Sequence, residues 1–113
     1  MARVIAQGTT SVAANATVKN VLSGETYERL PYDADVFIGL AASATGLLVS
    51  YLIGGIGIAV NIAPSIINRA PQFPQDYPVR GQEGAEGKQL ILSAQNTTGG
   101  ALSLFWIVEF DEL

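Results

Sequence analysis

Carboxylates are the residues of this chain that come nearest to doing chemistry. They stand close together in three places: Asp33 with Asp35, Glu83 with Glu86, and Glu109 with Asp111 and Glu112. A hard cation such as calcium takes about six to eight oxygen ligands, and none of these spacings matches a known calcium loop. We therefore expect solvated charges or salt-bridge partners here, and no metal site.

The usual nucleophiles and bases are missing. The chain contains no cysteine and no histidine, so it lacks the thiol nucleophile, the commonest general base and the commonest metal ligands. Ser43, Ser50 and Ser103 have no histidine to activate them. The glycines at 54–57 lead into strand-like residues and not into a helix, so they do not form a phosphate-binding loop. We expect no enzymatic activity and no cofactor.

Basic and aromatic residues give no clear binding motif. The six Lys and Arg residues are scattered singly among ten Asp and Glu residues. Nucleic-acid binding usually needs a basic patch or arm, so we expect no nucleic-acid partner. Trp106 and the tyrosines have rings that can stack on sugars, but Trp106 lies on the more apolar side of its segment, which favours packing in the core.

A long stretch without charge, from Val36 to Asn68, decides the fold class. Its first part, 36–53, is long enough to cross a bilayer as a helix, which makes a small membrane protein one alternative. Residues 56–62, however, alternate β-branched aliphatic residues with small or polar ones, and this period of two indicates a strand. No cluster of Lys or Arg flanks the stretch. The sequence therefore favours strands and no membrane partner.

Period-two alternation recurs along the whole chain, separated by turn residues such as Gly54-Gly55. The alternating segments are 3–7, 12–18, 36–42, 47–53, 56–62, 88–95 and 101–110. Short strands at this spacing are typical of sandwiches and barrels. We predict a single all-β domain over 1–113, an antiparallel β-sandwich of jelly-roll-like form.

Two regions interrupt or end this pattern. Residues 63–87 contain four prolines and predict a Pro-rich loop, which is either an interaction element or a crossover between two sheets. Residues 88–110 hold two alternating segments around Asn96–Gly100 and predict a C-terminal β-hairpin. The last segment is apolar on both sides, so we expect it to be a central strand or to be covered by another subunit.

The chain is poor in charge and rich in apolar residues. Charged residues make up 14% and hydrophobic residues 49% of the sequence, whereas an average soluble domain is about 25% charged. A soluble monomer normally covers itself with charge, so we expect part of this surface to be buried in an assembly. The predicted interface residues are Leu47, Val49, Tyr51, Ile56, Ile58, Pro71, Phe73, Pro74 and Tyr77.

In overall style the chain resembles small virion structural proteins, above all the capsid decoration (cement) proteins of tailed bacteriophages. The resemblance covers the short strands, the Pro-rich loop and the closing segment GKQLILSAQNTTGGALSLFWIVEF at 87–110. It implies a non-enzymatic protein that forms a homo-oligomer, such as a trimer, and clamps subunits of the major capsid protein. It also implies a location in the virion. The N-terminus lacks the apolar core of a secretory signal, so we expect synthesis in the host cytoplasm.

Two other functions remain open. One is a receptor- or carbohydrate-binding β-sandwich module of a phage fibre, which would present aromatic residues in a groove. The other is the small membrane protein that spans the bilayer with residues 36–53.

Overall fold

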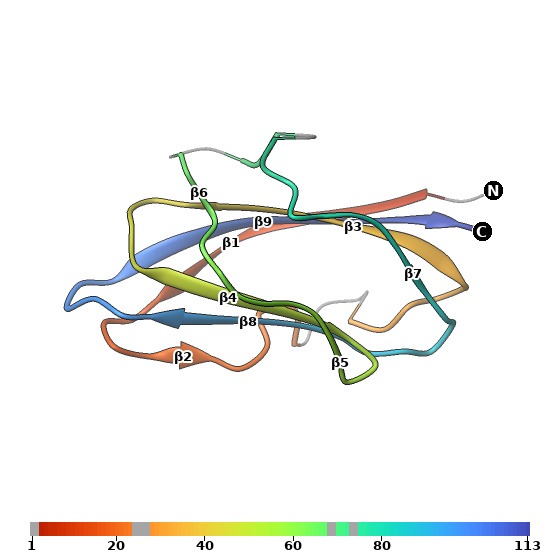
Figure 1. Ribbon diagram of the computed structural model, residues 1–113, viewed down its shortest axis with the longest axis horizontal. Helices are drawn as coiled ribbons and strands as arrows, with labels where there is room; N and C mark the ends of the chain where they lie inside the picture. The colour runs from red at the N-terminus through yellow and green to blue at the C-terminus, as the bar shows by residue number, and fades with distance from the viewer. Residues whose placement is uncertain (1–2, 24–27, 68–69, 73–74) are drawn as a thin grey trace.

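The structure, a computed structural model, describes residues 3–23, 28–67, 70–72 and 75–113. All its regular elements within these ranges are strands (Figure 1). They are β1 (Arg3–Val12), β2 (Thr17–Val18), β3 (Ala34–Ala42), β4 (Leu47–Ile53), β5 (Ile56–Ile62), β6 (Ser65–Ile66), β7 (Val79–Gly84), β8 (Leu90–Asn96) and β9 (Leu102–Glu112).

The strands form two sheets that face each other across one core, so the predicted all-β sandwich is confirmed. One sheet has the order β1-β9-β3, and both β6 and β7 pair with the far side of β3. The other sheet has the order β2-β8-β4-β5. All pairings are antiparallel except the short parallel one between β3 and β6.

The strand order is that of a jelly roll, which arises by folding the chain in half and rolling it up. The fold point is the turn Gly54-Gly55, whose positive φ values of 59° and 86° suit a tight hairpin turn between β4 and β5. Moving away from this turn, β3 pairs with β7, β2 with β8 and β1 with β9. These pairs make a long two-stranded ribbon. When the ribbon is rolled up, β3 also pairs with β9 and β4 also pairs with β8.

The predicted C-terminal hairpin is wrong. The two strands lie where the alternation placed them, but β8 pairs with β2 and β4 while β9 pairs with β1 and β3. The connection 97–101 therefore crosses from one sheet to the other. Alternation shows which residues of a strand face the core, and both strands satisfy it equally well in opposite sheets.

The structure also corrects two boundaries. The two alternating segments predicted at 3–7 and 12–18 are one long strand, β1, followed by a turn in which Asn15 has a φ of 56° and then by the short β2. The Pro-rich region 63–87 is a crossover between the sheets, as one of the two interpretations held, but it contains β6 and β7. Residues 36–53 form β3, β4 and their connection, and no helix in the described ranges is long and apolar enough to span a membrane.

Inward-facing residues from both sheets fill the core. Val36, Ile38 and Leu40 of β3 are at most 1% exposed, and the alternate residues of β4, β8 and β9 are buried in the same way. The predicted core position of Trp106 is confirmed at 4% exposed. Its indole lies under β1, where a Cβ on Gly8 would come within 2.7 Å of the ring, and its N–H donates to Thr10 Oγ1 at 3.2 Å. The glycine therefore lets β1 lie close to the tryptophan.

Asn96 closes one end of the sandwich with a buried amide. Its Nδ2 donates to the carbonyl oxygens of Val12 at 3.0 Å and Gly100 at 2.8 Å. Its Oδ1 accepts from the backbone N–H and the hydroxyl of Thr98. Because every polar group of this side chain is bonded, its burial at 1% exposure is tolerated. The amide ties the end of β1 to the connection between β8 and β9.

Tyr51 differs from Asn96, because its buried polar group makes no hydrogen bond within the part of the chain that the structure describes. Its side chain is 1% exposed, and its hydroxyl has no hydrogen-bond partner among the described residues. Burial raises the pKa of the Tyr51 hydroxyl far above its ordinary value.

We predict that Tyr51→Phe stabilises the protein by about 1 kcal/mol or more in urea unfolding at neutral pH, because it removes a buried polar group without a partner. An unfolded tyrosine ionises near pH 10, whereas folded Tyr51 keeps its proton, so stability falls as the pH rises above 10, by up to about 1.4 kcal/mol per pH unit. The variant should lack this loss. Tyr32→Phe, at a half-buried position, is the control, and a less stable Tyr51→Phe would contradict the prediction.

Candidate functional site

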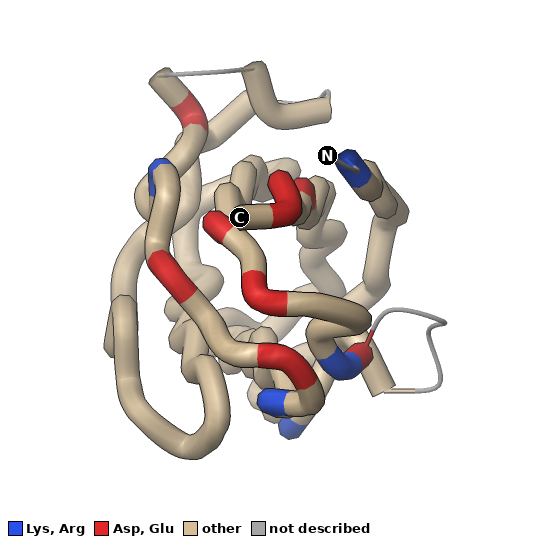
Figure 2. Tube along the Cα trace, turned by 90° about the vertical axis from the view of Figure 1, so that its right-hand side faces the viewer, with Lys and Arg blue, Asp and Glu red and all other residues tan. Residues whose placement is uncertain are grey.

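Charged residues gather at one end of the sandwich, where both termini lie (Figure 2). This end is formed by the start of β1, the end of β9, the start of β3, the connection from β7 to β8 and the segment 28–33. It carries Arg3, Glu28, Arg29, Asp33, Asp35, Glu83, Glu86, Lys88, Asp111 and Glu112. The connections at the opposite end, 13–16, 43–46 and 97–101, contain no charged residue. Charged residues are therefore distributed unevenly along the length of the molecule, with many at one end and none in the connections at the other.

The outward-facing residues of β4, β5 and β8 on one broad face are also uncharged, and the exposed Lys19, which follows β2, lies at its edge. Outward-facing residues of β4 pair directly with those of β8, Leu52 with Ile91 and Ser50 with Ser93. Val60 of β5 lies over Gly57, which pairs with Leu52, and is 62% exposed. We call this surface the uncharged face. It consists of Leu48, Ser50, Leu52, Val60, Ile91, Ser93 and Gln95.

Three of the predicted interface residues lie inside the protein. Leu47, Val49 and Tyr51 alternate inward on β4 and are at most 2% exposed, so the core of the chain itself accounts for their apolar side chains. The outward residues of the same strand were not predicted. On β5, Ile56 is 69% exposed and Ile58 is half-buried against the core. Of this group, only these two residues on β5 keep any surface that a partner can contact.

Residues of the Pro-rich crossover lie on the outer side of the other sheet. Pro71 and Tyr77 are buried there, because Gly39 of β3 leaves room for both. A Cβ on Gly39 would come within 2.6 Å of the Tyr77 ring and 2.9 Å of Pro71. The crossover thus covers part of β3 and its neighbour β9. β9 lies between β1 and β3, so of the two predicted alternatives, a central strand or a strand covered by another subunit, the first is confirmed. Phe73 and Pro74 lie outside the described residues.

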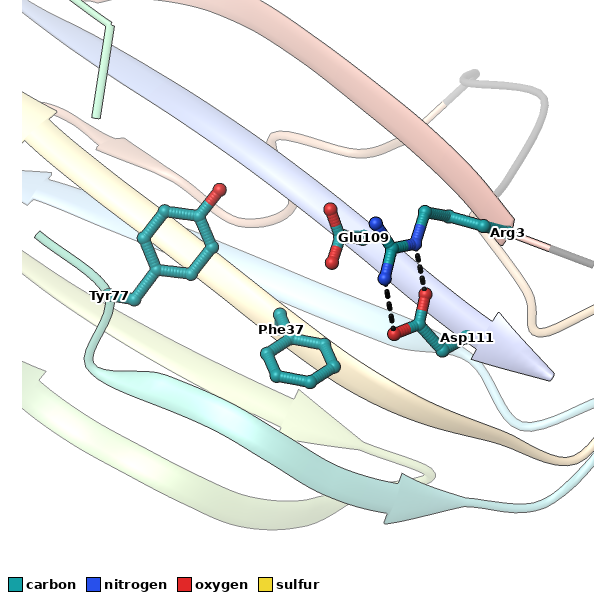
Figure 3. A pocket seen from close by; sticks show the side chains of 5 residues that line it. All are labelled: Arg3, Phe37, Tyr77, Glu109 and Asp111. Atoms are coloured by element: carbon teal, nitrogen blue, oxygen red, sulfur yellow. Dashed lines mark hydrogen bonds and ion pairs between the residues drawn. The ribbon is translucent and has the colours of Figure 1, made fainter. Parts of the chain in front are cut away.

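A cleft opens beside this covered region, on the outer side of β1, β9 and β3 (Figure 3). It has a volume of about 300 Å³ and is lined by Arg3, Phe37, Tyr77, Glu109 and Asp111. The aromatic rings of Phe37 and Tyr77 form one side, and the charged groups lie on the other (Figure 3). Strand register brings these residues together, because Phe37 pairs with Glu109 and Arg3 with Asp111.

A bidentate ion pair holds one wall of the cleft. Arg3 Nε and Nη2 donate to the two carboxylate oxygens of Asp111 at 2.7 and 3.2 Å. This hydrogen bonding and the nearby charge of Glu109 raise the pKa of Arg3. Burial raises the pKa of the Tyr77 hydroxyl, and the carboxylate of Glu109 adds to the effect. The cleft therefore presents a protonated phenol, a guanidinium and two carboxylates beside aromatic rings.

The acidic groups singled out in the sequence take different positions. Glu109 and Asp111 line the cleft, whereas Asp33 accepts the backbone N–H of Glu86 at 2.8 Å and so joins two of the three groups. Within the described ranges no three Asp or Glu residues gather closely enough to hold a metal ion. Arg3 and Phe37 were not singled out in the sequence. No local signal marks them, because they meet only through the pairing of β1 and β3 with β9.

Comparison with known proteins adds no relative: no protein-family model matches the chain, and neither the curated proteins nor the solved structures contain a significant match.

We predict that Gly39→Ala lifts the crossover from the sheet, because its new methyl group would overlap Tyr77, Pro71 and Ile107. The expected cost is about 1–3 kcal/mol in urea unfolding, with faster hydrogen exchange of the Leu40 N–H, which donates to the Asp76 carbonyl of the crossover at 3.0 Å. Gly99→Ala is the control, since no atom lies within 4 Å of the position that its Cβ would take. Equal behaviour of the two variants would show that the crossover does not depend on Gly39.

Proposed function

We propose that this chain is a non-enzymatic structural protein of a virus particle, which decorates a capsid and stabilises it by burying apolar surface between shell subunits. The observation that carries this proposal is the uncharged face. Its central residues Leu52 and Ile91 form a directly opposed apolar pair, and Val60 stands beside them.

The composition of this face suits a protein partner. The centre of a protein–protein interface is depleted of charged residues, and its rim is polar. Ser50, Ser93 and Gln95 supply uncharged hydrogen-bonding groups on the same face. A standard interface buries about 800 Å² on each partner. Repetition over a symmetric shell adds avidity, so each single contact can be weak.

The fold is compatible with this role but does not decide it. Jelly rolls occur in viral capsid proteins and also in lectins and cupins, and one fold hosts unrelated functions. The argument therefore depends on the surface and not on the strand order. The major capsid protein is the partner that we propose for the uncharged face.

We predict that Leu52→Asp lowers binding to the shell by about tenfold or more, because it buries an unpaired charge at the centre of the contact. The measurement is co-sedimentation of purified chain with particles of the encoding virus from which the native copies have been stripped. Gln82→Asp adds the same charge to an exposed position of β7, in the other sheet, and should bind normally. A wild-type chain that does not sediment with particles, or two variants that bind equally, would refute the proposal.

The cleft supports a second candidate function, the binding of carbohydrate by a module of a phage fibre. Aromatic rings beside charged hydrogen-bonding groups suit a sugar, which has both apolar C–H faces and hydroxyl groups. Phe37 and Tyr77 supply the rings, and Arg3, Glu109 and Asp111 supply the polar groups. The volume of about 300 Å³ falls at the lower end of small-molecule sites.

If the cleft binds sugar, Phe37→Ala should weaken the binding of a glycan found on an array by about tenfold, since stacking of the ring is lost. Isothermal titration measures the change. Phe105→Ala is the matched control, because Phe105 is a half-buried aromatic residue on the outer side of β9 that does not line the cleft. An array without hits would exclude this function and leave the shell-binding proposal untouched.

A further inference from the structure

β1 is a long edge strand with one open side. It pairs with β9 over all ten of its residues, and no strand of the described ranges pairs with its other side. In an antiparallel pair, every second residue directs its backbone N–H and C=O away from the partner strand. These groups form a template on which another strand can pair.

The other sheet edges carry features that block such pairing. On β5 the register with β4 shifts twice, and Asn61 has a φ of 51°, so the edge is bulged. β2 is only two residues long, and beyond it Asn20 covers the edge of β8 by accepting from Leu92 N–H and donating to the Leu90 carbonyl. β7 is bulged against β3 and carries Arg80 and Glu83.

β1 has none of these protective features. It contains no proline, no lysine and no register shift, and its only charged residue is Arg3 at its first position. Trp106 also holds the strand in place from the core side, through its contact with Gly8 and the hydrogen bond from its indole N–H to Thr10. A partner strand would therefore meet a backbone that is already ordered, which lowers the entropy cost of pairing.

We infer that β1 pairs antiparallel with β1 of a second copy of this chain, so that the two sheets continue into one across a two-fold axis. The position of the single charged residue on β1 favours a second copy of the chain as the partner. In an antiparallel pair the two copies of Arg3 stand at opposite ends, about 27 Å apart, so no like charges face each other. A closed two-fold contact is also the commonest form of homo-oligomer.

The alternation of β1 restricts the register. Opposed residues must lie on the same side of the sheet, so the axis passes midway between one residue and its own copy, which stands opposite it. The longest overlaps are centred on Gln7 or Gly8. The Gln7 register uses residues 3–11 and leaves out Val12, whose carbonyl already accepts from Asn96 at 3.0 Å. We therefore place Gln7 opposite Gln7, with Ile5 opposite Thr9 and Arg3 opposite Ser11.

Single cysteines test this register directly, because the chain has no cysteine of its own. Gln7→Cys should form a disulfide-linked dimer under mild oxidation, since opposed residues of antiparallel strands have Cα atoms about 4.5–5.5 Å apart, within disulfide range. Ser11→Cys is the control: it is equally exposed on the same side of β1, but its two copies would lie about 27 Å apart. It should remain monomeric on a non-reducing gel.

A charge variant gives a second measurement that needs no oxidation. Gln7→Lys puts two like charges directly opposite each other and should weaken dimerisation by about fivefold or more in sedimentation equilibrium. Val60→Lys adds the same charge to the edge strand β5 and should leave the dimer unchanged. Circular dichroism confirms that both variants are folded.

Three outcomes would overturn the inference: a wild-type chain that is monomeric at high concentration, a trimer such as the family resemblance implies, or equal cross-linking of Gln7→Cys and Ser11→Cys. All these measurements use purified chain without shells. They therefore stand apart from the co-sedimentation test, and the dimer can fail while shell binding succeeds, or the reverse.

Discussion

The packing of two apolar sheet faces against each other is the contact on which the other features of this protein depend. Because successive side chains of a strand point to opposite sides, a strand that buries Val36 and Ile38 must turn Phe37 outward. In a chain with 14% charged residues, these outward sets are largely uncharged as well. Formation of the core therefore leaves apolar outer surfaces, which Pro71 and Tyr77 of the crossover cover only over part of one sheet.

Local sequence signals were enough to predict β3, β4, β5, β8 and β9, the residues of each that share a face, and the turn at Gly54-Gly55, but not β6 or β7. Each of these depends on period two or on backbone conformation within a few residues. The predicted hairpin at 88–110 failed because alternation does not record the partner of a strand. The turn residues at 97–101 suit a hairpin and a crossover equally well. Rolling of the sheet, which places β9 between β1 and β3, is a property of the whole chain.

The candidate sites were harder to predict than the fold, for a related reason. Lack of charge marks Leu47 and Leu52 equally, yet one faces the core and the other faces outward. A stretch without charge therefore indicates apolar side chains, but not which of them face outward. The cleft depends on strand register and on the position of Tyr77 in the crossover, because Arg3 and Phe37 come from strands at opposite sides of β9.

The proposed surfaces differ in position, and this decides how they would work together. β1 forms an edge of one sheet, whereas the uncharged face belongs to the other sheet. Pairing at β1 would therefore join two chains without covering either uncharged face. A dimer would present two such faces at a fixed separation, so its second contact with a lattice would be intramolecular. The affinity of each face could then stay low enough to keep the free protein soluble, while the dimer holds the shell firmly.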